Sequence, residues 1–115
     1  MKAAIYHGTA DVRVEEVAKP VIGAGELLVK VKACAICGGD LRTFRHGHKA
    51  IHPPIILGHE IAGEVVEVGS GVAGDWKPGD RVQVIAAVPC GKCHECRKGW
   101  MAVCQNQTSV GYQYD

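Results

Sequence analysis

Four cysteines lie close together near the end of the sequence. Two residues separate Cys90 from Cys93 and Cys93 from Cys96, and Cys104 follows after seven more. Zinc takes four ligands in a tetrahedron, and a loop that carries closely spaced thiolates wraps around the ion with little strain. We therefore predict that these four cysteines bind one structural zinc ion.

The segment that carries these cysteines, residues 89–104, has no hydrophobic periodicity and is rich in Gly, Lys and Cys. We call it the four-cysteine lobe. A segment without a core needs another source of folding free energy, and a bound metal supplies it. Lys92, Arg97 and Lys98 could offset the two net negative charges of zinc with four thiolates. We expect His94 to be a bystander.

Two alternatives compete with zinc in this lobe. Disulfides are disfavoured because we expect a cytoplasmic protein, where thiols stay reduced. An iron–sulfur cluster is the sharper alternative, since bacterial ferredoxins share the first two spacings. In ferredoxins the fourth cysteine comes sooner and precedes proline, whereas here Gln105 follows Cys104. The spacing favours zinc.

A second group of metal-ligating residue types begins at Cys37 and Asp40 and continues at His59 and Glu60. A cysteine, a histidine and a carboxylate suit a catalytic zinc, which has three protein ligands and one open position. Asp40 could accept the remaining imidazole N–H of His59 and fix its tautomer. Residues of these types at this distance are often unrelated, so spacing alone leaves this site open.

Length and composition limit the classes of protein. The 115 residues make one domain or part of one, and the net charge of +1 argues against an electrostatic nucleic-acid binder. No apolar run is long enough to span a bilayer, and we find no signal peptide. We therefore expect a cytoplasmic protein with neither nucleic acid nor membrane as partner.

The elements that must position these residues are mainly strands. Apolar residues alternate with polar ones over residues 12–17, 27–33, 64–68 and 81–85, which predicts half-buried strands with Val31 on an inward face. Residues 77–80 form a predicted turn. Residues 40–46 could form one or two helical turns with Asp40 as N-cap. The strand count and turn spacing fit a small barrel or sandwich.

Some motifs match known functional patterns but are better explained by structural roles. Residues 69–74 match G-x-G-x-x-G, but Pro78 and Gly79 follow too soon for the helix that a phosphate-binding loop needs, so we predict a turn. Cys34 shares the parity of Lys30 and Lys32, which favours a structural thiol over a redox motif. Phe44 could line a substrate cleft or pack in the core.

These motifs together resemble the N-terminal catalytic domain of the zinc-dependent medium-chain alcohol and polyol dehydrogenases, which include sorbitol and threonine dehydrogenases. The resemblance covers essentially the whole chain. It rests on four motifs in order: Cys37-Gly38-Gly39-Asp40; Gly58-His59-Glu60 with Gly63 and Gly69; Pro78-Gly79-Asp80-Arg81-Val82; and the four-cysteine lobe.

The resemblance implies a mainly β fold over residues 1–115: a GroES-like, partly open β-barrel with short helices and an irregular structural-zinc lobe at 89–104. It implies a catalytic zinc on Cys37 and His59, with Asp40 behind the ligands. Glu60 matches a residue that is a further ligand in polyol and threonine dehydrogenases and lies behind the metal in other branches. Both roles stay open.

The resemblance also implies a function. In such enzymes zinc acts as a Lewis acid on a secondary alcohol or polyol while hydride passes to NAD or NADP, and the full-length enzyme is a homo-oligomer, a dimer or a tetramer. There are two alternatives. One is a non-catalytic zinc-stabilised β module that docks onto another chain, and the other is a co-chaperonin, which is supported only by the expected barrel shape.

The sequence departs from the family pattern in two ways. Gly39 stands where relatives carry Ser or Thr, whose hydroxyl begins a proton relay, so another hydroxyl, a water or a histidine such as His46 must serve. The sequence also ends at Asp115, before the dinucleotide-binding domain and the last zinc ligand of the family. We therefore expect this chain alone to be inactive in hydride transfer.

Overall fold

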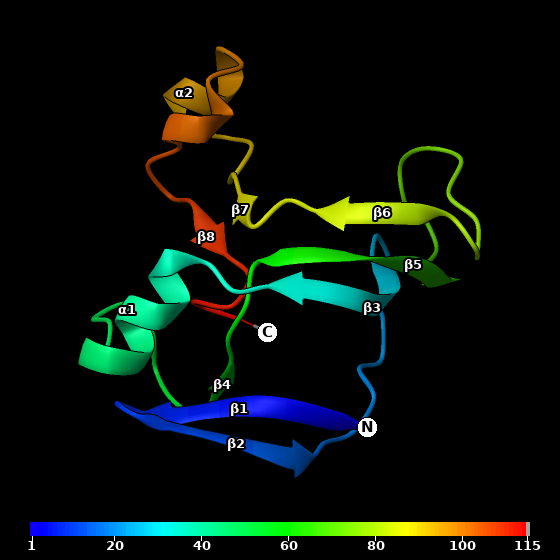
Figure 1. Cartoon of the computed structure of the whole chain (residues 1–115). Helices are drawn as coiled ribbons and strands as arrows, with labels where there is room; N and C mark the ends of the chain where they lie inside the picture. Colours follow the sequence, from blue (N-terminus) through cyan, green and yellow to red (C-terminus); the bar gives the residue numbers. More distant parts are fainter. Residues whose placement is uncertain (115) are drawn as a thin grey trace.

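The computed structural model describes residues 1–114, and these form a mainly β fold with short helices (Figure 1). The helices are α1 (Gly38–His46), α2 (His94–Arg97) and a single 3-10 turn (Met101–Val103). The strands are β1 (Lys2–Gly8), β2 (Asp11–Glu16), β3 (Leu27–Ala35), β4 (Ile55–Ile56), β5 (Glu60–Val68), β6 (Arg81–Val84), β7 (Ala87–Val88) and β8 (Thr108–Ser109).

The strands of the described chain form three antiparallel sheets, in the orders β2-β1-β4, β3-β5-β6 and β7-β8. Figure 1 shows the first two sheets facing each other across the body of the molecule, with α1 at one end and α2 in a separate projection. The sheets of residues 1–114 do not close into one barrel. The expected mainly β, partly open barrel with short helices is confirmed.

The pairing of β3 with β5 is the part of the fold that positions the second group of predicted ligands. The two strands run antiparallel, and Ala35 at the end of β3 is the partner of Glu60 at the start of β5. Two residues past Ala35 the chain reaches Cys37, and one residue before Glu60 it passes His59. The register therefore brings Cys37 and His59 to the same end of the sheet.

The alternating segments form strands as predicted, but burial along β3 does not follow the expected alternation. Leu28 is buried, whereas Val31, predicted to face inward, is 54% exposed. The register shifts near Val29 and Ala33 change which face each side chain occupies. From Val31 to Ile36 every residue is exposed, so no other element of residues 1–114 covers this part of β3.

A small apolar cluster links the first sheet to α1. Tyr6, Ile51 and Ile55 are its buried members, and Leu57 and Tyr112 pack against them. The Tyr6 hydroxyl donates a hydrogen bond of 3.2 Å to the carbonyl oxygen of Thr43 in α1. This cluster holds the helix in place above β1, since a buried hydrogen bond and apolar packing act at the same point.

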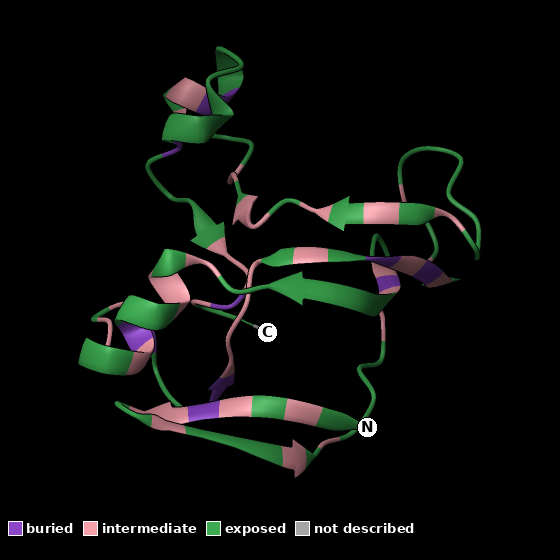
Figure 2. Cartoon of the chain, in the orientation of Figure 1, coloured by how far each residue is buried: buried purple, intermediate pink, exposed green. Residues whose placement is uncertain are grey.

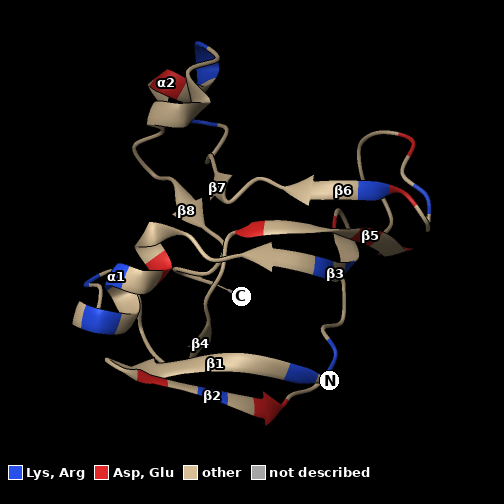
Figure 3. Ribbon diagram, viewed as in Figure 1, with Lys and Arg blue, Asp and Glu red and all other residues tan. Residues whose placement is uncertain are grey.

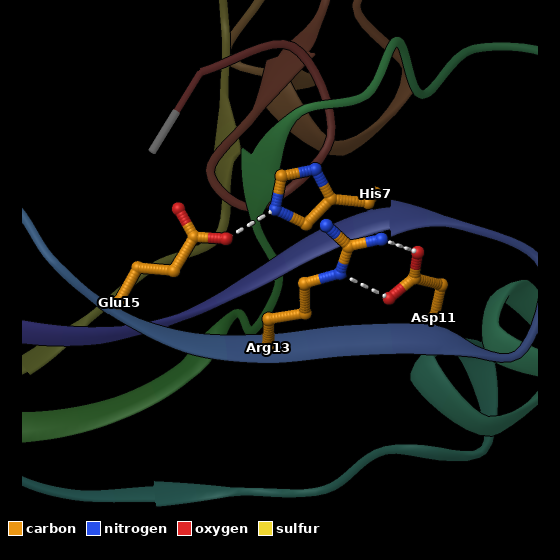
Figure 4. Close-up of polar contacts among 4 residues, drawn as sticks. All are labelled: His7, Asp11, Arg13 and Glu15. Atoms are coloured by element: carbon orange, nitrogen blue, oxygen red, sulfur yellow. Dashed lines mark hydrogen bonds and ion pairs between the residues drawn. The ribbon is translucent and has the colours of Figure 1, made fainter.

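Polar contacts on the β1–β2 hairpin lie on the molecular surface (Figure 4). Arg13 donates two hydrogen bonds to the Asp11 carboxylate, which lower the pKa of Asp11, and His7 pairs with Glu15 at 2.6 Å. Solvent screens such exposed pairs, so they contribute little to the stability of the hairpin.

The glycine-rich connection between β5 and β6 contains turns and no helix. Its last turn, residues 77–80, is closed by the Asp80 amide, which donates to the Lys77 carbonyl oxygen at 3.1 Å, while the Asp80 carboxylate accepts from the Lys77 amide at 2.9 Å. Gly79 takes a φ of 97°, which favours glycine. Both predictions, a turn at 77–80 and no phosphate-binding helix after Gly74, are confirmed.

The four-cysteine lobe lacks a hydrophobic core in the structure too (Figure 2). Cys96 and Cys104 are its buried residues, whereas the large apolar side chains of Trp100, Met101 and Val103 are more than half exposed. Apolar packing within residues 1–114 therefore does not account for the shape of the lobe.

Acidic and basic residues lie on neighbouring strands (Figure 3): Glu64 of β5 is the strand partner of both Lys30 of β3 and Arg81 of β6. Neither α1 nor α2 has the length or the apolar character that a bilayer-crossing helix requires.

Gly63 offers a test of the β3–β5 packing. A Cβ atom at this buried position would lie 2.5 Å from Val29 Cγ1 and 2.6 Å from the Lys30 carbonyl oxygen. We predict that Gly63→Ala lowers the free energy of unfolding by about 1–3 kcal/mol, because the two strands must separate to admit the methyl group. Gly38→Ala is the matched control, since no atom lies within 4 Å of its Cβ position. Equal stability of both variants in urea denaturation would contradict this packing.

Candidate metal centres

The four-cysteine lobe is joined to the body by a two-stranded sheet. Ala87 pairs with Ser109 and Val88 with Thr108, so β7 and β8 hold the two ends of the lobe together. The lobe then turns through Gly91, at a φ of 71°, into α2, for which Cys93 is the N-cap. All six cysteines of the chain are free.

The sulfur atoms of the lobe converge on one point. Each of the four predicted ligands, Cys90, Cys93, Cys96 and Cys104, places its sulfur within 4.8 Å of the others. Cys93 Sγ and Cys104 Sγ are 3.8 Å apart. A tetrahedron with Zn–S bonds of about 2.3 Å has edges of about 3.8 Å, so the spacing fits zinc. His94 is exposed and does not belong to this group, as expected.

Backbone amides donate hydrogen bonds to sulfur atoms of the lobe. The Cys90 amide donates to Cys104 Sγ at 3.3 Å. Backbone N–H groups of Lys92 and Cys93 donate to the Cys90 sulfur and lower the pKa of this thiol to about 6. Burial raises the pKa of the Cys96 thiol to about 12. A divalent cation at the centre favours the thiolate of each cysteine.

The second group of predicted ligands also meets. Cys37 is the N-cap of α1, His59 precedes β5, and Glu60 is the first residue of β5. Cys37 Sγ, a ring nitrogen of His59 and a carboxylate oxygen of Glu60 lie within 4.8 Å of one another. Cys37 and His59 are half-buried and Glu60 is exposed. A thiolate, an imidazole and a carboxylate with one side towards solvent fit a zinc ion with an open position.

Asp40 lies behind this group but is not the N-cap that the sequence predicted. The helix starts at Gly38, earlier than expected, so Asp40 occupies the third helical position. From there its Oδ2 accepts the Cys37 amide at 2.8 Å, and its Oδ1 lies 3.5 Å from His59 Nδ1. The carboxylate therefore touches the backbone of one candidate ligand and faces the ring of the other.

His59 Nδ1 is buried and makes no hydrogen bond within residues 1–114. Its nearest acidic group is the Asp40 carboxylate, and the His59 and Asp40 side chains are only 15% and 13% exposed. With Nδ1 turned towards a carboxylate, Nε2 is the nitrogen left for a metal ion. This is the arrangement in which a second group orients a metal-binding imidazole.

Tyr112 and His48 were missed by sequence reasoning. The Tyr112 ring contacts both His59 and His48 edge-on, with ring centroids 5.6 Å and 5.2 Å away. Burial, with the nearby negative charges of Asp40 and Cys37, raises the pKa of Tyr112. No sequence signal predicts this contact, because it depends on how the backbone at Gly111 packs against the backbone of Gly58. Gly111 has a φ of 74°, and a Cβ atom there would overlap the Gly58 carbonyl oxygen.

Other candidate residues lie elsewhere. His46 is exposed at the C-terminal end of α1, about 10 Å along the helix axis from Gly39, so the structure does not place it at this group. Phe44 is half-buried in the same helix. Cys34 is exposed on β3 and is not part of either ligand group.

Comparison with known proteins assigns the family. Residues 23–113 match the alcohol dehydrogenase GroES-like domain. The chain belongs to this family.

Curated relatives agree with this assignment. The chain is 44% identical over 107 residues to sorbitol dehydrogenase of Bacillus subtilis (strain 168), covering 90% of this chain and 30% of that protein. It is 50% identical over 103 residues to L-threonine 3-dehydrogenase of Pyrococcus abyssi (strain GE5 / Orsay), covering 87% of this chain and 29% of that protein. The chain thus spans about 30% of the length of these relatives.

A solved structure shares the fold over nearly the whole chain. It is described as a zinc-binding dehydrogenase from Sinorhizobium meliloti 1021 bound to NADP, with a TM-score of 0.89 and 39% identity over 99% of this chain and 33% of that chain. These similar proteins are dehydrogenases, so the comparisons do not support the alternatives of a non-catalytic module or a co-chaperonin.

The contact of Asp40 with His59 predicts a measurable change in metal affinity. In Asp40→Asn the side-chain oxygen still accepts the Cys37 amide, but the charge that faces His59 Nδ1 is gone. We expect this variant to bind zinc at the second group about 10- to 100-fold more weakly in chelator competition. Asp75→Asn, in an exposed loop, is the control. If both variants bind zinc like the original chain, Asp40 does not orient the imidazole.

Proposed function

We propose that this chain is the zinc-binding catalytic domain of an NAD(P)-dependent alcohol or polyol dehydrogenase that oxidises a secondary alcohol. The observation that carries the proposal is the meeting of Cys37, His59 and Glu60 within 4.8 Å at the end of the β3–β5 sheet. The names of the relatives support the same reaction class, because they include a sorbitol dehydrogenase and a threonine dehydrogenase.

In this proposal each residue of the group has its own role. Cys37, His59 and Glu60 are the ligands of a catalytic zinc, which supplies Lewis-acid chemistry to a substrate hydroxyl. Asp40 is a positioning residue that orients the imidazole of His59 and, through the Cys37 amide, the first turn of α1. The exposed side of Glu60 is the side from which substrate approaches.

The four-cysteine lobe has a structural role in the same proposal. A zinc ion on Cys90, Cys93, Cys96 and Cys104 has no open position, so it stabilises residues 89–104 and takes no part in the reaction. The exposure of the large apolar side chains in the lobe supports this, because metal ligation then replaces a core.

The cofactor site belongs to the rest of such an enzyme. The similar structure from Sinorhizobium meliloti 1021 contains NADP, and this chain covers 33% of it. We propose that, in a full-length enzyme of this family, a part outside the region shared with this chain binds the nicotinamide cofactor and holds its ring near Cys37 and His59.

Metal content and turnover together test the proposal. We predict two zinc ions per chain, one in His59→Ala, and two in His94→Ala, the control with an exposed histidine in the lobe. In the complete enzyme, His59→Ala lowers kcat by about 10³-fold or more, since Lewis-acid stabilisation is worth several kcal/mol. Loss of both ions from His59→Ala, or full turnover without the second ion, would show that this group is not a catalytic centre.

A further inference from the structure

The absence of a side chain at Gly39 leaves space beside the proposed catalytic zinc, and Tyr112 fills it. A Cβ atom at Gly39 would lie 2.9 Å from the Tyr112 hydroxyl and 3.9 Å from both Cys37 Sγ and His59 Cε1. The phenol oxygen of Tyr112 thus occupies the space that a side chain at position 39 would need. It reaches this place from a segment more than fifty residues away in the sequence.

The backbone holds Tyr112 in this position. Gly111 packs against Gly58, the residue before His59, so closely that no side chain fits between them. The Gly111 amide donates to the Tyr114 carbonyl oxygen at 2.7 Å, and the Tyr112 amide donates to that of Ser109 at 3.2 Å. The Tyr112 ring also packs against the apolar cluster around Tyr6. Its placement next to His59 is therefore built into the fold.

The Tyr112 hydroxyl has hydrogen-bonding capacity to spare. Among the hydrogen bonds of residues 1–114 it has none, although it lies beside two candidate metal ligands, Cys37 and His59. The neighbouring His48 does not hydrogen-bond to the Tyr112 hydroxyl. Its Nδ1 accepts the Ala50 amide at 3.2 Å, and its ring contacts Tyr112 edge-on. A polar group at the rim of a site with an unused donor is suited to a ligand oxygen.

We propose that the Tyr112 hydroxyl hydrogen-bonds to the hydroxyl oxygen of the alcohol substrate, and that Gly39 is small so that Tyr112 can reach it. This inference rests on the proposed function, because it requires a metal ion on Cys37, His59 and Glu60. Tyr112 would then be a catalytic residue that orients the reacting oxygen. A side chain at position 39 and the Tyr112 ring would exclude each other, because both need the same space.

Cobalt in place of zinc gives a readout that does not depend on turnover, because its visible absorption changes when a ligand enters an open coordination position. The cobalt-loaded chain is titrated with trifluoroethanol, a small alcohol of low pKa, and difference spectra report the open site alone. We expect Tyr112→Phe to weaken trifluoroethanol binding about 3- to 10-fold, the loss of one hydrogen bond. Tyr114→Phe, at an exposed tyrosine, is the matched control and leaves binding unchanged.

A second pair of variants moves the hydroxyl to the other side chain. Tyr112→Ala opens the space and weakens trifluoroethanol binding, and Gly39→Ser added to Tyr112→Ala supplies a hydroxyl from position 39. We expect the double variant to bind about as well as the original chain. A double variant no better than Tyr112→Ala alone would overturn the pairing.

The outcomes separate this inference from the proposed function. A chain that takes up one cobalt ion, in the lobe only, overturns both. A chain that takes up two ions, with equal trifluoroethanol affinity in Tyr112→Phe and the original, leaves the catalytic centre in place and overturns the role of Tyr112. Weaker binding in Tyr112→Phe and unchanged binding in Tyr114→Phe, with two ions in each, supports it.

Discussion

The antiparallel register of β3 against β5 is the constraint on which the second metal-ligand group depends. Because Ala35 pairs with Glu60, the chain leaves β3 and enters β5 at the same end of the sheet, and the side chains of Cys37 and His59 meet there. A register shift of one residue would turn the side chains at this end of the sheet to the opposite face. The close packing of Gly63 against Val29 and Lys30 depends on the same register. The packing of the sheet and the geometry of the site therefore depend on the same strand pairing.

The four-cysteine lobe obeys a different physical rule from the body of the molecule. In the body, apolar side chains around Tyr6 are buried and a hydrogen bond from Tyr6 fixes α1. In the lobe, Cys96 and Cys104 are buried, while the side chains of Trp100, Met101 and Val103 are more than half exposed. We expect a segment of this kind to gain its order from metal ligation. The short β7–β8 sheet joins the lobe to the C-terminal segment, in which the Tyr112 ring contacts His59.

Local sequence signals predicted most of the longer strands and which candidate ligand side chains would lie together. Period-two alternation marked the strands, and the cysteine spacing marked a cluster whose sulfur atoms do converge. The signals failed where distant segments meet. No spacing rule connects Tyr112 with Gly39, because their contact depends on how Gly111 passes Gly58. The exposure of Val31 was missed for a related reason: alternation predicts which face a residue occupies, and the rest of the fold decides whether that face is covered.

Anomalous X-ray scattering from crystals of the zinc-loaded protein, collected on both sides of the zinc absorption edge, tests directly whether both ligand groups bind zinc. We expect two peaks that vanish below the edge. One lies among the sulfur atoms of the four-cysteine lobe, and the other lies between Cys37 Sγ, His59 Nε2 and the Glu60 carboxylate. A single peak in the lobe, with the Cys37 and His59 side chains bound to no metal, would contradict the catalytic assignment; an iron signal in the lobe would contradict the structural one.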